Sequence, residues 1–133
     1  MNAILEIIET RNLYSHLILF KLYLDSKGRI NDIYNGNLDS EISELLGDEF
    51  SKEYLYNAKQ WLNSKGYTKY IGSRALSEYG RDYLESWILN FEKLESKDKE
   101  ILKEKLPEKV FKYFGIAADA YTVGTFIQTL QLL

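Results

Sequence analysis

The fold of this chain is decided by residues 39–66, which read DSEISELLGDEFSKEYLYNAKQWLNSKG. Asp39 can cap a short helix, and Gly47 can end it, because glycine leaves the helical conformation at little cost. A second helix follows, with Ser51 as its cap and Gly66 just beyond its end. Two helices joined by a short turn that contains glycine are typical of a helix-turn-helix motif.

The second helix, expected over residues 52–64, has two different faces. Its apolar and aromatic side chains share one arc of about 120° on a helical wheel, and they are Tyr54, Leu55, Ala58, Trp61 and Leu62. Its other side carries Lys52, Glu53, Tyr56, Asn57, Gln60 and Asn63. We expect the first set to be buried and the second set, which is rich in amides, to face solvent.

Amphipathic segments flank this motif. Apolar residues at helical spacing predict one long helix, or two helices joined near Thr10, that end at Gly28. A short strand is plausible over residues 29–34. His16 lies beside the apolar stripe of the first segment, where a lone histidine is more often packed or solvated than functional.

The chain beyond Gly66 changes pattern. Aromatic and β-branched residues predict a strand over residues 67–71 and a short return strand over 74–76. Ser77 can then cap a long amphipathic helix. Further helices are expected around residues 101–106 and after Pro107, so the fold class is mainly α with a small β-hairpin.

Three stretches resemble winged helix-turn-helix proteins. They are Ile42-Ser43-Glu44-Leu45-Leu46-Gly47, Leu62-Asn63-Ser64-Lys65-Gly66-Tyr67 and Leu76-Ser77-Glu78-Tyr79-Gly80-Arg81-Asp82-Tyr83-Leu84. They look like the positioning helix, the exit from the recognition helix and the start of the helix after the wing. The chain thus resembles small bacterial and phage proteins similar to the MarR and PadR regulators, over about residues 13–85.

The resemblance implies that the second helix of the motif binds in the major groove of double-stranded DNA, with the wing near the backbone. The residues expected to contact DNA are Ser51, Lys52, Tyr56, Asn57, Gln60, Lys65, Lys69 and Arg74. Amide side chains can read adenine, and Lys and Ser can hold phosphates or guanine. The chain is then a non-enzymatic, DNA-binding transcriptional regulator.

Two domain segments follow from this interpretation. Residues 1–95 form the winged helix-turn-helix domain, and residues 96–133 form an added C-terminal helical extension. The extension carries a narrow stripe of apolar and small residues: Ile116, Ala120, Val123, Gly124, Ile127 and Leu130. We expect this stripe to pack against the first helix, against a second copy or, least favoured, against a membrane surface. We expect a homodimer built on the first and last helices.

Composition excludes several other functions. The chain has no cysteine and a single histidine, so the usual zinc sites and a thiolate nucleophile are excluded, and we expect no metal, no cofactor and no enzyme activity. No secretory signal and no apolar run long enough to span a bilayer is evident, which predicts a cytoplasmic protein without a membrane span.

Charge distribution keeps a second hypothesis open. The net charge is −3, yet residues 51–81 carry six positive and two negative side chains, as a polyanion-binding face would. Residues 31–50 carry six negative side chains and no positive one, which opposes contact with phosphates. The alternative is a winged-helix protein–protein interaction module, an adaptor or inhibitor that does not bind DNA.

Overall fold

The computed structural model describes residues 3–122, and the side chains of residues 4–115. The described residues form six α-helices, two 3₁₀ helices and one two-stranded sheet. The elements are η1 (Ala3–Ile8), α1 (Thr10–Ser26), α2 (Leu38–Leu46), η2 (Gly47–Glu49), α3 (Lys52–Ser64), β1 (Thr68–Lys69), β2 (Ala75–Leu76), α4 (Glu78–Glu92), α5 (Ser96–Lys105) and α6 (Glu108–Thr122). The predicted mainly α class with a small hairpin is confirmed.

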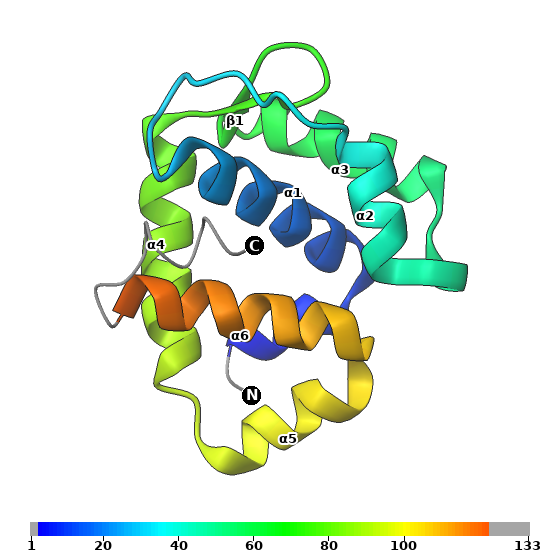
Figure 1. Ribbon diagram of the computed structural model, residues 1–133, viewed down its shortest axis with the longest axis vertical. Coiled ribbons are helices and arrows are strands. Elements are labelled where there is room, and N and C mark those ends of the chain that lie inside the picture. The colour runs from blue at the N-terminus through cyan, green and yellow to red at the C-terminus, as the bar shows by residue number, and fades with distance from the viewer. Residues whose placement is uncertain (1–2, 123–133) are drawn as a thin grey trace.

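Helix α1 lies at the centre of the molecule and contacts α2, α3, α4 and α6 (Figure 1). Its side chains from Leu13 to Phe20 are buried without interruption, so the helix is enclosed around its circumference. The N-terminal segment forms two of the helices, as one of the two predicted alternatives has it: a 3₁₀ helix and an α-helix that meet at Glu9. At its end Lys27 is the C-cap, with φ of 57°, and Gly28 follows it in the predicted left-handed conformation, with φ of 81°.

The caps of α2 and α3 set their directions. Asn37 caps α2 by accepting a hydrogen bond from the Ser40 amide, so the prediction of Asp39 as the cap is wrong. The Glu41 carboxylate accepts a hydrogen bond from the Asn37 amide at 2.9 Å, which satisfies a second backbone donor. Helix α3 has the predicted bounds, with Ser51 as its cap.

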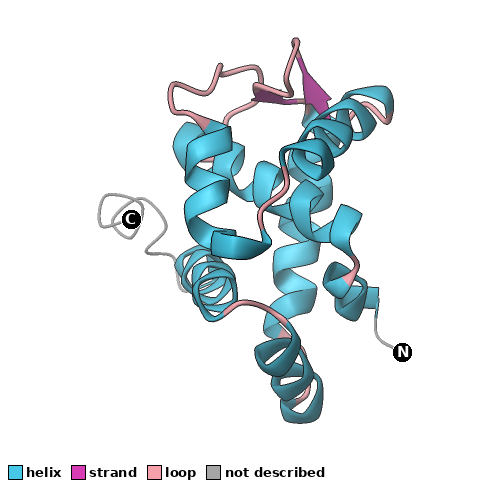
Figure 2. Ribbon diagram, turned by 90° about the vertical axis from the view of Figure 1, so that its right-hand side faces the viewer, coloured by secondary structure: helices cyan, strands magenta, loops and turns pink. Residues whose placement is uncertain are grey.

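Strands β1 and β2 pair antiparallel, with Thr68 opposite Leu76 and Lys69 opposite Ala75. The segment over residues 29–34 forms no strand, contrary to the prediction. It nevertheless runs beside β2, where Asn31 and Tyr34 donate backbone hydrogen bonds to the carbonyl groups of Leu76 and Arg74. The hairpin lies at the opposite end of the molecule from α5 (Figures 1 and 2).

The last helices pack onto the same core. Helix α5 begins at Ser96, five residues before the predicted Ile101, and so includes the charged run. Helix α6 contacts α4, α2 and α1, and it continues through Gly115 without a break. Val110 and Phe114 are fully buried, and the Phe114 ring lies 4.9 Å from that of Phe20. The described part of α6 is thus packed within its own chain.

Candidate nucleic-acid interface

Helix α3 is fixed to the protein by one face. Its buried side chains, Leu55, Ala58 and Leu62, are at most 1% exposed, and the helix packs on α1. These residues recur at intervals of three and four, so the opposite face of the helix must point to solvent. With 13 residues, α3 is about 20 Å long.

The outward face of α3 consists of Lys52, Tyr56, Asn57 and Gln60, all of which are exposed. None of these four side chains makes a hydrogen bond or an ion pair with another described residue. Lys52, Tyr56 and Gln60 are each four residues apart and form one row along the helix. Glu53 is also exposed and places one negative charge beside Asn57.

The remaining candidate residues divide into free and engaged side chains. Lys65 and Lys69 are exposed at the end of α3 and on β1, without an ion pair to a described residue. The Ser51 hydroxyl accepts a hydrogen bond from the Tyr54 amide at 3.4 Å as the cap of α3. The Arg74 guanidinium donates to the Tyr34 carbonyl oxygen at 2.8 Å. Among the described residues, six of the candidate side chains have no polar partner and two have one.

Polar side chains tie the hairpin to the last turns of α3. The Asn63 amide donates to the Tyr70 carbonyl oxygen at 2.7 Å, and the Ser73 hydroxyl donates to the Lys59 carbonyl oxygen at 2.6 Å. The Thr68 hydroxyl donates to Asn63 at 2.6 Å. Sequence reasoning missed these anchors, because Asn63 reads only as another polar residue of the outward face.

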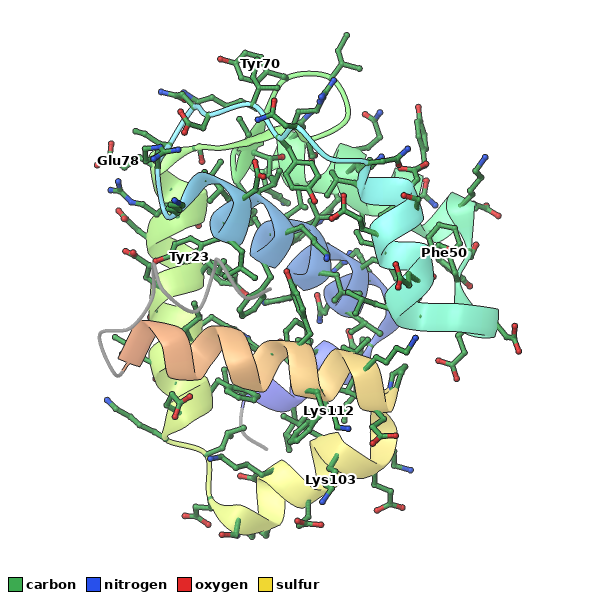
Figure 3. The ribbon with its side chains drawn as sticks, in the orientation of Figure 1. Tyr23, Phe50, Tyr70, Glu78, Lys103 and Lys112 are labelled. Atoms are coloured by element: carbon green, nitrogen blue, oxygen red, sulfur yellow. The ribbon has the colours of Figure 1, made fainter. Side chains whose placement is uncertain are left out.

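The turn of the hairpin presents aromatic and apolar side chains. Tyr70 lies at the tip (Figure 3) and is 52% exposed, and Ile71 beside it is 93% exposed. Tyr70 and Ser73 have φ values of 71° and 55°, in the left-handed region that non-glycine residues rarely adopt. The hydrogen bonds to α3 hold this tight turn in place.

Cations pair with part of the acidic segment over residues 31–50. Lys59 of α3 lies 2.6 Å from the Asp39 carboxylate, and Lys21 of α1 lies 3.6 Å from Glu41. Arg29 pairs with Asp32 at 2.5 Å. These contacts offset three of the six negative charges in the segment, while Glu44, Asp48 and Glu49 remain exposed.

The tyrosines around the motif differ from one another. Tyr54 was expected in the core, but it is 53% exposed. The centroid of its ring lies 6.0 Å from that of Tyr14. Tyr67 is half-buried and stacks on Tyr79 at 4.8 Å, and burial raises the pKa of Tyr67 to about 12. Tyr83 is also half-buried, and its hydroxyl bonds to His16.

His16 is 7% exposed, so of the two alternatives expected for it, packed or solvated, the structure shows the packed one. Its Nδ1 lies 2.7 Å from the Asn12 carbonyl oxygen and its Nε2 lies 2.8 Å from the Tyr83 hydroxyl. Burial lowers the pKa of His16 from 6.5 to about 4, so the ring is neutral at physiological pH. No cluster of three or more His, Cys, Asp or Glu suited to a metal occurs among the described residues.

The side chains of the predicted dimerisation stripe all lie outside those that the structure describes. Val123, Gly124, Ile127 and Leu130 lie outside the described residues, and Ile116 and Ala120 lie where only the backbone is described. Within the described part of the chain, no helix has the length and apolar character needed to cross a membrane.

Comparison with known proteins gives no match, whether the chain is set against protein-family models, against curated proteins or against solved structures.

Proposed function

We propose that the chain is a non-enzymatic, DNA-binding regulator of winged-helix type that reads duplex DNA with α3. The observation that carries this proposal is the outward face of α3, where Lys52, Tyr56, Asn57 and Gln60 are exposed and make no hydrogen bond or ion pair with another described residue. A buried residue or one held by a neighbour is unavailable to a base edge. These side chains are available. Two of them are amides, and each amide can form two hydrogen bonds with one adenine.

The surroundings of α3 support the same proposal. The major groove is about 12 Å wide and admits an α-helix, so a helix that projects one whole face fits the groove. Lys65 lies at the end of α3, and Lys69 lies on β1 of the hairpin that follows. Lysines in such positions can contact phosphates. Lys59 pairs with Asp39, and Lys21 pairs with Glu41. These ion pairs reduce the electrostatic repulsion between the acidic segment and the DNA phosphates.

The test is a fluorescence polarisation titration of the full chain with random-sequence duplex DNA at low and at moderate salt. We expect saturable binding that weakens as salt rises, because displaced counterions drive association with phosphates. A chain that binds no duplex at low salt, or binds it equally at both salt concentrations, contradicts the proposal.

A second candidate function is a protein–protein interaction module. It is favoured by the exposed aromatic and apolar side chains near α3, namely Tyr54, Tyr56, Tyr70 and Ile71. Aromatic residues are enriched at protein interfaces, and the exposed acids of α2 and η2 suit a basic partner. This candidate replaces the first if the duplex titration fails.

A further inference from the structure

A cavity of about 300 Å³ lies between η1, α1 and α4, apart from the outward face of α3. Its apolar lining comes from Ile4, Ile7 and Trp87. Its polar lining includes Glu6 and Tyr83. A concave site with an apolar body and a few convergent polar groups has the composition of a small-molecule site.

A second, smaller cavity of about 30 Å³ adjoins the first, and Asn12, His16 and Tyr83 line both. The Ser15 side chain lines the smaller one. Its hydroxyl is buried and makes no hydrogen bond with any residue that the structure describes. A cavity of about 30 Å³ has room for about one water, so a larger ligand fits only the larger cavity.

The Tyr83 hydroxyl oxygen, on the wall of the larger cavity, can accept a hydrogen bond from a ligand. The Asn12 carbonyl can only accept, so Nδ1 of neutral His16 carries the proton and Nε2 accepts the proton of the Tyr83 hydroxyl. The lone pairs of the Tyr83 oxygen therefore remain available to a donor. His16 itself brings no positive charge, because burial lowers its pKa to about 4.

Charge points the same way. Glu6 is the one charged side chain among the described residues that line the larger cavity. Its negative charge contributes to the raised pKa of Tyr83, after burial, which places the Tyr83 hydroxyl in the field of the carboxylate. Trp87 and His16 both line the cavity, and the centroids of their rings lie 5.1 Å apart.

We propose that this cavity binds a small organic cation, with its ammonium group between Glu6 and the Tyr83 hydroxyl and its apolar body against Ile4, Ile7 and Trp87. The site offers the Glu6 carboxylate and the acceptor oxygen of Tyr83 beside the Trp87 ring, and its single negative charge among the described lining residues disfavours anions. The proposal is independent of DNA binding by α3.

The experiment titrates the full chain with 2-phenylethylammonium and follows the NMR signal of the Trp87 indole N–H. The neutral isostere 2-phenylethanol and the anion phenylacetate are titrated in parallel. We expect saturable shifts with a Kd in the millimolar range for the ammonium probe, weaker binding of the alcohol and none of the carboxylate. Equal affinity for the three probes, or no shift of the Trp87 signal, overturns the proposal.

Variants assign the charge and the place. Glu6→Gln changes an exposed carboxylate, and we expect it to weaken ammonium binding by about two- to fivefold and to leave the alcohol unchanged. Glu100→Gln, an exposed carboxylate on α5, is the matched control and is expected to change neither. Unchanged ammonium affinity in Glu6→Gln overturns the charge assignment on which the proposal rests.

Ser86→Phe places a ring in the cavity from an exposed position on α4, where the substitution leaves the core intact. We expect this variant to lose both the ammonium and the alcohol probe while its thermal unfolding stays cooperative. A folded Ser86→Phe chain that still binds the ammonium probe as the parent does overturns the location of the site.

Discussion

The hydroxyl of Tyr83 on α4 donates a hydrogen bond to Nε2 of His16 on α1 over 2.8 Å, across 67 residues of sequence. The His16 ring is held from its other side by the Asn12 carbonyl oxygen of its own helix. The imidazole therefore has both nitrogens satisfied in the neutral form, and protonation would turn Nε2 from an acceptor into a donor facing the Tyr83 hydroxyl.

The first prediction concerns acid stability. The pKa of His16 is lowered by burial to about 4, against 6.5 in an unfolded chain, so the unfolded state takes up the proton first as pH falls. The stability that neutral His16 confers is fully present above about pH 6.5. It decreases as the pH falls from about 6.5 to about 4. The full loss amounts to about 3 kcal/mol, measurable by urea unfolding across that range.

The control for this prediction is His16→Gln, which cannot titrate. It should be less stable than the parent at neutral pH, because the bonds to Asn12 and Tyr83 are impaired, and its stability should fall less between about pH 6.5 and about pH 4. Identical pH dependence in the two chains would show that His16 does not control acid stability.

The second prediction concerns two glycines. A Cβ at Gly80 would collide with the Tyr67 carbonyl oxygen, whereas a Cβ at Gly115 meets nothing within 4 Å. Gly80→Ala should lower the free energy of unfolding by about 1–3 kcal/mol through overpacking. Gly115→Ala should raise it by about 0.5–1 kcal/mol, because alanine favours the helix. Chemical denaturation measures both, and equal effects of the two substitutions would contradict the close contact at Gly80.

The third prediction concerns the outward face of α3. Lys52→Ala should weaken binding to every duplex sequence and lower the salt slope by about one unit, since one phosphate contact is lost. Asn57→Ala and Gln60→Ala should instead reduce discrimination between sequences by about 1–3 kcal/mol. Polarisation titrations with a selected and a random duplex separate the two effects. Loss of affinity without loss of discrimination in both amide variants would remove base reading from the proposed function.

The fourth prediction concerns the oligomeric state. The apolar stripe of the C-terminal extension predicts a homodimer, in which Val123→Asp combined with Ile127→Asp should give monomer or aggregate in sedimentation. Lys97→Asp, on the exposed surface of α5, is a charge-changing control that should sediment as the parent does. A parent chain that stays monomeric at high concentration would contradict the dimer.

Local signals in the sequence predicted α3 well. Ser51 and the apolar spacing fixed the bounds and the outward face of α3, because a cap and a helical period act over a few residues. Asn37 was missed as the cap of α2. Its side chain accepts a hydrogen bond from the Ser40 backbone N–H, but Asp39, two residues later, is an equally good cap by residue type.

Contacts between distant segments could not be predicted in the same way. The bond between Tyr83 and His16, and the cavity beside it, depend on how α1 and α4 cross, which no spacing within either helix encodes. Tyr54 shares the apolar arc of α3 by angle, but it packs against Tyr14 with one side only and leaves the other in water. A helical wheel shows in which direction a side chain points. It does not show how far the core extends in that direction, and so not how much of the side chain is buried.

The hydrogen bonds from Asn63 and Ser73 that join the hairpin turn to α3 bear on the thermodynamics of any association at this surface. These bonds hold Tyr70 and Ile71 at a fixed position relative to α3. A partner therefore meets one continuous surface instead of a helix and a separate loop. Little conformational entropy then remains to be lost when the complex forms, and each contact contributes more of its gross energy to affinity. The same rigidity narrows the choice of partners, because a surface that cannot adjust excludes shapes that it does not already fit.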